Sequence, residues 1–450
     1  MRKPVVALAS VLALTALALP TVAKTKPAAT RFGKPVKITP DLAYGYEPSI
    51  FADRYGNLYA TAHKENWQLA LGPDSREPTQ TRSMSWAWYS ADNGATWKNL
   101  PTGPMDVNIW SHNFGDEGDM AVDDNGFVYF VDTNVTDITF TAWKTTGRDK
   151  VTFDHHLPVA AFGEPVDDRP WVTAHGDGHV FYLGNEGNKG EYPGGQPPFG
   201  GGEGNANGPG RYTVYSSYDH GNTWDHLGYS LNDSGWCRPA ADHTAGSKYV
   251  YVICGNDVKK VYSFVSADDG KTWNRYFIDD YEPASTDSWP SVEVAKDGSL
   301  WATHVSKVEK DVEKITLYHS KTHGKSWSKQ DITPLKGRFV YQWLSVSPDG
   351  KKLGLGTYYR PDAKSPWKVY GAVWKPGEKP KLVSLDDKNP VAPVVAGDPP
   401  GDYLGSTFAP DGHLSVIWTR VVLRSPVADA DPTGEVPKTL ERDIYTARSL

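Results

Sequence analysis

Seven segments of the chain repeat one pattern of apolar and polar positions: a short apolar stretch, a turn that contains glycine, and a second stretch in which aromatic or aliphatic residues alternate with others. Alternation with a period of two predicts β-strands, and no long segment shows a helical period. The seven turn glycines are spaced 52 to 70 residues apart, at Gly56, Gly126, Gly178, Gly246, Gly298, Gly350 and Gly412. This spacing predicts an all-β chain of seven similar four-stranded sheets.

A second motif closes hairpins within this pattern. It consists of Ser, a carboxylate two residues on, Gly, and Thr-Trp, and it occurs at residues 90–97, 217–224, 266–273 and 320–327. The carboxylate can accept backbone N–H bonds across a tight turn, glycine supplies a positive φ, and tryptophan anchors the next strand. We therefore interpret the motif as a structural turn without a chemical role.

The motif Ser-x-Asp-x-Gly-x-Thr-Trp resembles the Asp-box (BNR) repeats of the sialidase superfamily. Three copies match fully, whereas the fourth has Thr322 and Ser326 in place of Asp and Thr, so we expect a weaker turn there. The resemblance implies a β-propeller in which these turns join the third and fourth strands of a blade, on the face away from the active site. Sialidase propellers have six blades, which remains the alternative to the seven that the repeats favour.

The two ends of the chain are predicted to complete the last blade together. After the seventh copy, residues 442–450 suffice for a third strand but leave no room for a fourth. Residues 32–38 can supply that strand, which would close the ring and remove two exposed sheet edges. Residues 24–450 are thus expected to form a single propeller domain.

Composition and targeting signals predict an exported protein. Residues 1–23 combine a basic start, an apolar run and a small residue at Ala23, which is typical of a cleaved signal peptide. We therefore expect a secreted, extracellular monomer without membrane insertion. The formal net charge of −7 argues against nucleic acid as a partner. The only two cysteines, Cys237 and Cys254, fall on successive predicted strands, so we expect a disulfide.

One position in each blade is predicted to line the mouth of the central channel. It lies eight or nine residues before the turn glycine, at Glu47, Glu117, Arg169, Arg238, Trp289, Tyr341 and Tyr403. Carboxylates, guanidiniums and aromatic rings are the groups that a glycan site needs. His304 lies near the end of a second strand on the same face. The alternative is a structural plug of ion pairs that fills the channel.

Insertions mark the same face, because long loops carry function on a rigid scaffold. They cover residues 63–82, 101–115, 185–210 and 421–441, and the glycine-rich stretch 185–210 is expected to be a lid or linker loop.

The resemblance also suggests roles for individual residues. Tyr403 matches the placement of the family's nucleophilic tyrosine, Arg169 and Arg238 match two of its carboxylate-binding arginines, and Asp74 is a loose match to its catalytic aspartate. The chain departs from the family at Glu47, which replaces an arginine, and at Trp289, which stands where the activating glutamate is expected.

Glu47 is predicted to adjoin Tyr403 where the first and last blades meet. A carboxylate there would activate the phenol as a nucleophile or a base. Trp289 or Tyr341 would stack on a sugar, and Glu117 and Asp74 are the next carboxylates to consider.

Three functions follow as hypotheses. The first is a secreted sialidase-like hydrolase that acts on a carbohydrate or glycoconjugate at the channel mouth. The others are a uronate polysaccharide lyase and a non-catalytic propeller that binds carbohydrate or protein. An enzyme needs carboxylates of raised pKa in a closed pocket, whereas a binding module needs an open aromatic platform. No cofactor is expected, and the sequence leaves open whether calcium binds among the aspartates near the mouth.

Overall fold

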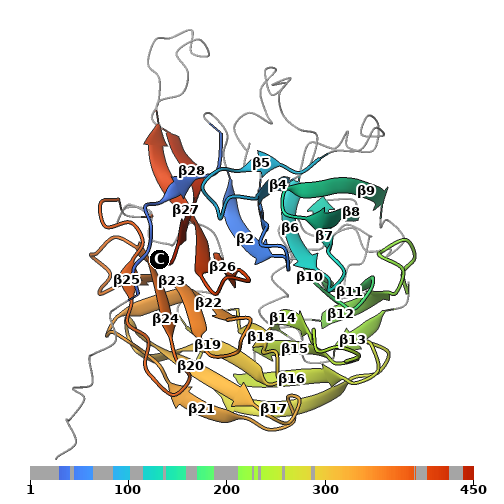
Figure 1. Ribbon diagram of the computed structural model, residues 1–450. Coiled ribbons are helices and arrows are strands. Elements are labelled where there is room, and N and C mark those ends of the chain that lie inside the picture. Colours follow the sequence, from blue (N-terminus) through green and yellow to red (C-terminus); the bar gives the residue numbers. More distant parts are fainter. Residues whose placement is uncertain are drawn as a thin grey trace, which may run out of the picture.

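The structure is a computed structural model in which β-strands form seven four-stranded antiparallel sheets arranged around a central axis (Figure 1). It describes residues 30–40, 45–63, 85–101, 115–134, 138–158, 170–186, 211–225, 228–231, 235–255, 259–284, 289–389, 391, 403–424 and 439–450. The predicted seven-bladed β-propeller is confirmed.

Each blade uses consecutive strands except the last. Blade 1 contains β2 (Tyr46–Ala52), β3 (Leu58–His63), β4 (Ser85–Ser90) and β5 (Lys98–Asn99). Blade 2 contains β6 (Gly115–Val122), β7 (Phe127–Asn134), β8 (Ile138–Gly147) and β9 (Lys150–Pro158). Blade 3 contains β10 (Trp171–His175), β11 (His179–Glu186), β12 (Arg211–Ser217) and β13 (Tyr229–Leu231).

The order continues around the ring. Blade 4 contains β14 (Trp236–Ala241), β15 (Val250–Gly255), β16 (Lys260–Ser266) and β17 (Asn274–Asp280). Blade 5 contains β18 (Ser291–Val294), β19 (Leu300–Glu309), β20 (Val312–Ser320) and β21 (Ser328–Asp331). Blade 6 contains β22 (Arg338–Val346), β23 (Leu353–Arg360), β24 (Lys368–Trp374) and β25 (Val383–Ser384). Blade 7 contains β26 (Gly405–Phe408), β27 (Leu414–Arg424), β28 (Thr439–Arg448) and β1 (Val36–Lys37).

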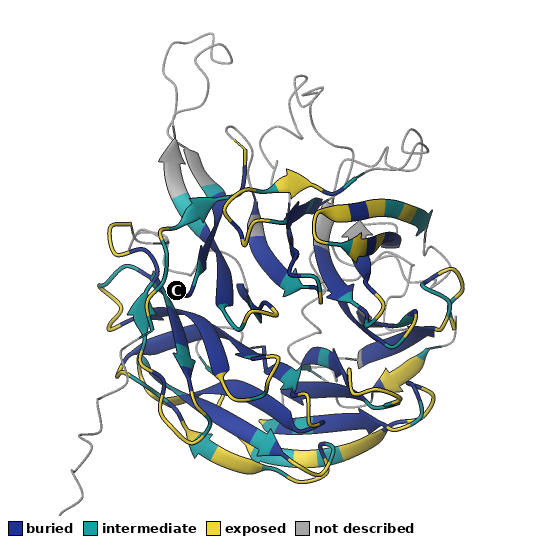
Figure 2. Ribbon diagram, in the orientation of Figure 1, coloured by how far each residue is buried: buried dark blue, intermediate teal, exposed yellow. Residues whose placement is uncertain are grey.

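The core lies between neighbouring blades. The second strands β3, β15 and β23 are buried along their whole length, whereas the outer strands β5, β17 and β21 are largely exposed (Figure 2). Tyr129 of blade 2, for example, shares one hydrophobic cluster with Val180 and Tyr182 of blade 3. Second strands therefore lack the polar face of a half-solvated sheet, because both faces pack against neighbouring blades.

The seven turn glycines all adopt the left-handed backbone conformation, with φ between 69° and 94°. This conformation is costly for residues that carry a Cβ atom. At Gly126 a Cβ would also lie only 2.7 Å from the backbone oxygen of Thr145. The glycine spacing in the sequence therefore marks the hairpins between first and second strands, as predicted.

The four repeat turns, residues 90–97, 217–224, 266–273 and 320–327, join third and fourth strands. In the first, Asp92 accepts hydrogen bonds from the backbone and the hydroxyl of Thr96, at 2.8 and 2.6 Å, and Ser90 Oγ accepts one from Gly94 N. In the fourth, Thr322 Oγ1 accepts the bond from Ser326 N at 2.9 Å. A hydroxyl thus takes the place of the carboxylate, and the turn keeps its form.

The N-terminal strand closes the ring as expected. Val36 and Lys37 of β1 pair with Thr446 and Tyr445 of β28. Backbone bonds from Gly33 N to Arg448 O and from Ile38 N to Ile444 O extend the contact on both sides. The edge strand of blade 7 therefore comes from the opposite end of the described chain.

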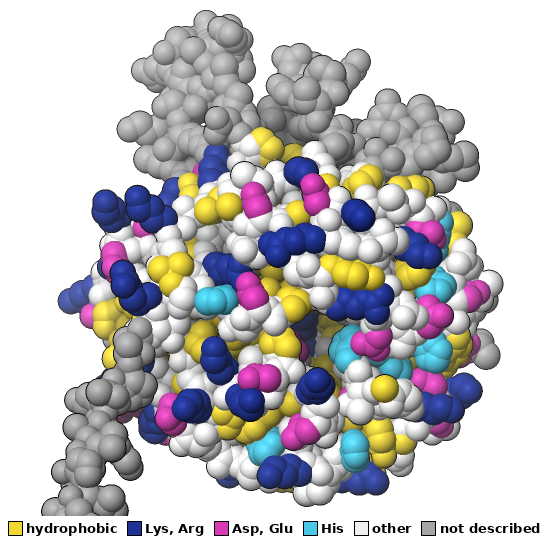
Figure 3. Space-filling view, viewed as in Figure 1, with side chains coloured by type: hydrophobic (Ala, Val, Ile, Leu, Met, Phe, Trp, Pro, Cys, Tyr) yellow, Lys and Arg dark blue, Asp and Glu magenta, His cyan; other side chains and the backbone are white. Residues whose placement is uncertain are grey.

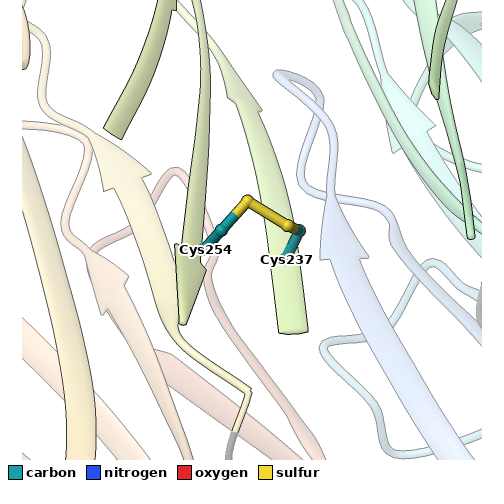
Figure 4. The surroundings of a disulfide bond; sticks show 2 residues. All are labelled: Cys237 and Cys254. Atoms are coloured by element: carbon teal, nitrogen blue, oxygen red, sulfur yellow. A yellow bond between two sulfur atoms is a disulfide. The ribbon is translucent and has the colours of Figure 1, made fainter. Parts of the chain in front are cut away.

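A disulfide links Cys237 and Cys254, which face each other directly across β14 and β15 (Figure 4). The predicted bond is confirmed, and both side chains are fully buried. Such a bond is consistent with an oxidising, extracellular location. The predicted signal peptide lies outside the described residues. Within the described part of the chain, the structure has no helix of the length and apolarity needed to cross a membrane.

Candidate site at the mouth of the channel

The order of the strands separates two ends of the propeller. Because successive strands are antiparallel, the glycine hairpins and the repeat turns lie at one end, which we call the turn face. The links between second and third strands, and those from one blade to the next, lie at the other end, which we call the mouth. The insertions predicted to mark the functional face all start there, and most of their residues lie outside the described ranges.

Arg238 of β14 lies between two tryptophans near the channel axis. Its guanidinium carbon is 3.8 Å from the ring centroid of Trp171 and 4.0 Å from that of Trp343. Its Nη1 is 3.8 Å from Oδ2 of Asp119, across the channel on β6. Two cation–π contacts and a buried carboxylate thus hold a side chain that is itself almost fully buried.

Trp171 also contacts two of the predicted site residues, Tyr403 and Trp289. The ring of Tyr403 lies 5.0 Å from it and the ring of Trp289 lies 5.5 Å from it, both in edge-to-face geometry. Tyr403 also packs on Trp343 at 6.1 Å and lies close enough to Arg238 for an electrostatic interaction. The structure therefore brings Arg238, Trp289 and Tyr403 together around Trp171.

Two carboxyl groups near Arg238 are held in a weakly acidic range. Burial raises the pKa of Asp119 to about 6, and the positive charge of Arg238 opposes the rise. Burial likewise raises the pKa of Glu293, on β18, to about 7, against the charges of His243 and Arg238. Groups that titrate in this range can exchange protons near neutral pH.

Glu47 occupies a strained position at the start of β2. Its φ is 53°, it is 4% exposed, and its Oε2 lies 3.2 Å from Nε2 of His63. Its backbone N–H donates to Oγ1 of Thr419 in blade 7. The pairing of β2 with β3 shifts by one residue at this point. A bulge with a left-handed residue is costly and is common beside functional sites.

Tyr341, at the corresponding position of β22, also combines a left-handed backbone conformation with a β-bulge. Its φ is 55°, and the β22–β23 register shifts beside it. Its ring lies edge-on to Tyr358 at 6.1 Å. Burial raises the pKa of Tyr358, and Glu47 is among the contributing charges, so Glu47, Tyr341 and Tyr358 lie in one region between blades 1, 6 and 7.

His304 of β19 is buried close to the mouth. It is 1% exposed, its ring lies edge-on to Tyr281 at 4.3 Å, and neither ring nitrogen has a hydrogen-bond partner among the described residues. Burial lowers its pKa to about 4, against the attraction of Asp279. The imidazole is therefore neutral at physiological pH.

Six of the predicted site residues have side chains that the structure describes, and three do not. All six whose side chains are described are at most 8% exposed: Glu47, Arg238, Trp289, His304, Tyr341 and Tyr403. Asp74 and Arg169 lie outside the described residues, and Glu117 lies in β6 without a described side chain. The proposed coupling of Glu47 to Tyr403 stays a prediction.

Four residues of this region were not among the predicted site residues: Asp119, Trp171, Glu293 and Trp343. Asp119, Trp171 and Trp343 each stand two positions after a predicted ring residue, which is a signal that the sequence does contain. Glu293 has no such signal, because its role depends on the charges of His243 and Arg238 from another blade.

Comparisons with known proteins leave the family open. No protein-family model and no curated protein matches the chain. Among solved structures, it is similar to a protein of unknown function from Dyadobacter fermentans, with 13% identity, a TM-score of 0.48, and 94% of this chain and 100% of that one covered. It is also similar to a GH74 enzyme from Niastella koreensis, with 15% identity, a TM-score of 0.49, and coverages of 87% and 53%. A third match is the NanB sialidase from Streptococcus pneumoniae, with 12% identity, a TM-score of 0.43, and coverages of 89% and 68%.

Proposed function

We propose that this protein is a secreted glycan-acting enzyme, a sialidase-like hydrolase in its general chemistry, with its site at the mouth of the channel. The observation that carries this proposal is the cluster in which Arg238, Tyr403 and Asp119 meet among Trp171 and Trp343. It combines a fixed cation, a phenol, a titratable carboxyl group and flat apolar rings, which are the groups used to bind and cleave sugars.

Burial and pKa favour catalysis over simple binding. A sugar-binding platform presents open aromatic faces, whereas Trp171, Trp289 and Tyr403 are each at most 2% exposed. Asp119, which is fully buried beside Arg238, has a pKa raised to about 6, as required of a group that acts as an acid near neutral pH. Both features suit an enclosed reaction site.

Tyr403 is the proposed reactive group. Negative charge that develops on its phenol oxygen would be stabilised by the nearby guanidinium of Arg238. Glu47 is proposed as its proton acceptor, either directly or through His63, whose Nε2 lies 3.2 Å from the carboxylate. Arg238 would also attract the carboxylate of an acidic sugar.

A uronate lyase is the second candidate, and the proximity of Tyr403 to Arg238 favours it. A lyase needs a base that removes a proton beside a carboxylate and a cation that neutralises that carboxylate, and Tyr403 with Arg238 meets both needs. A structural ion-pair plug would instead leave Arg238 and Asp119 without any part in turnover.

The test is a screen of the purified protein against sialosides, neutral aryl glycosides and uronate polysaccharides, followed by Tyr403→Phe on the best substrate. Loss of the phenol should lower kcat by at least about a hundredfold with little change in stability. Tyr182→Phe, at a buried tyrosine between blades 2 and 3, is the matched control and should keep full activity. Full activity in Tyr403→Phe would remove the proposed role. A protein that binds glycans but cleaves none of them would favour the binding module.

A further inference from the structure

Histidines gather on the molecule beside the central hollow, over β10 to β12 (Figure 3). Three side chains of this region place nitrogen and oxygen atoms within 4.8 Å of one another: His175 and His179 of blade 3 and Asp269 of blade 4. All three stand on the turn face, because His175 and His179 flank the hairpin at Gly178 and Asp269 belongs to the repeat turn at residues 266–273. The cluster is therefore separate from the mouth.

The distances within the cluster match those between ligands of one metal ion. Oδ1 of Asp269 lies 3.3 Å from Nε2 of His175 and 3.3 Å from Nδ1 of His179. Two ligand atoms that each lie about 2.1 Å from a tetrahedral zinc ion are about 3.4 Å apart. The two distances from Asp269 are thus close to the spacing of ligand atoms around one zinc ion, and all three ligand atoms lie within 4.8 Å of one another.

His175 supplies the second observation. It is 2% exposed, and its Nε2 points toward Asp269 without a hydrogen-bond partner among the described residues. A buried polar atom without a partner is costly.

The interface between blades 2 and 3 has an acid and a histidine at the positions that correspond to His175 and Asp269. There a hydrogen-bonded hydroxyl links the two side chains. Between blades 2 and 3, Asp123 occupies the place of His175, three residues before its turn glycine, and His220 occupies the place of Asp269. There the Tyr129 hydroxyl lies 2.8 Å from both Asp123 Oδ2 and His220 Nδ1.

Between blades 3 and 4 the two residue types are exchanged: the histidine, His175, precedes the turn glycine, and the acid, Asp269, lies in the repeat turn. Phe181 occupies the position that corresponds to Tyr129. The hydroxyl that would link them is therefore missing.

We propose that His175, His179 and Asp269 bind a divalent transition-metal ion, with zinc as the first expectation, that joins blades 3 and 4 on the turn face. Two imidazoles and a carboxylate are a usual zinc ligand set, with a fourth position left for water. The side chain of His179 is 33% exposed and gives the ion access from solvent. His243 and Asp124 lie beside the cluster and form an ion pair with each other at 2.8 Å.

The test uses the full-length protein without an affinity tag, stripped with a chelator and titrated with Zn²⁺ by calorimetry. We expect one ion per chain with a Kd of about micromolar or tighter. At about a hundred times that Kd, free zinc should raise the folding equilibrium constant about a hundredfold. Co²⁺ in place of zinc should give the visible absorption bands of a tetrahedral site.

Variants assign the ion to these residues. Asp269→Asn keeps the shape of the side chain, and His179→Ala removes a partly exposed ligand, so both should fold while weakening zinc binding at least about tenfold. The matched control is His323→Ala, at the corresponding place in the turn of blade 5, which should keep wild-type affinity. Absence of saturable binding, or binding that Asp269→Asn and His179→Ala leave unchanged, would overturn the proposal.

Discussion

His304 is a titratable side chain without a hydrogen-bond partner among the described residues. Because it is buried beside Tyr281, its charged form is unfavourable in the folded protein, and its pKa falls from 6.5 to about 4. In the unfolded chain the same group takes up a proton near pH 6.5. The unfolded state therefore binds more protons between these two values, and stability falls as the pH is lowered through this range.

We predict that His304→Phe makes stability less sensitive to acid. Between pH 7 and pH 4.5 the native histidine should cost about 2 kcal/mol of unfolding free energy that the variant retains. Urea unfolding of both proteins at the two pH values measures the difference. Equal losses in the two proteins would show that His304 does not carry this dependence.

Arg238 shows where prediction from sequence stops at the residue scale. Counting back from the turn glycine placed it at the mouth, because that count depends only on strand length. Its partners Trp171, Trp343 and Asp119 come from three other blades. Which long side chain reaches which neighbour depends on how the blades are rotated about the axis, and a local pattern carries no information on that rotation.

The β14–β15 hairpin carries the disulfide formed by the two cysteines of the sequence. Cys237 and Cys254 are 17 residues apart and face each other in register. A double Cys237→Ala, Cys254→Ala variant should lose about 2–4 kcal/mol of unfolding free energy, since a loop of this length gains conformational freedom in the unfolded chain. Guanidinium unfolding measures the loss. A variant with the parent midpoint would show that the bond contributes nothing.

At the scale of the element, alternation and glycine positions predicted the hairpins well, because both arise from local backbone geometry. The bulges at Glu47 and Tyr341 were not predicted. A bulge adds one residue to a strand, and the sequence shows no change of pattern there. Both of these bulges fall at predicted ring positions, whereas other register shifts, such as those of β16–β17 and β19–β20, lie elsewhere.

The whole ring depends on its seventh blade. Removing the chain through Ile38 deletes β1 and its flanking bonds, among them those from Gly33 to Arg448 and from Ile38 to Ile444. At about 1 kcal/mol for each backbone bond, we expect a loss of about 3 kcal/mol or more. The matched control ends its deletion at Ala29, before the described residues begin. Thermal or urea unfolding that does not distinguish the two would contradict closure by β1.

The pairing of β1 with β28 also sets an order of events during synthesis. Val36 and Thr446 are neighbours in space but among the first and last described residues to leave the ribosome. Blades 1 to 6 can form in sequence as their strands emerge, whereas β1 has no partner until β28 follows. The ring can therefore become one cooperative unit only after β28 has been made and has paired with β1.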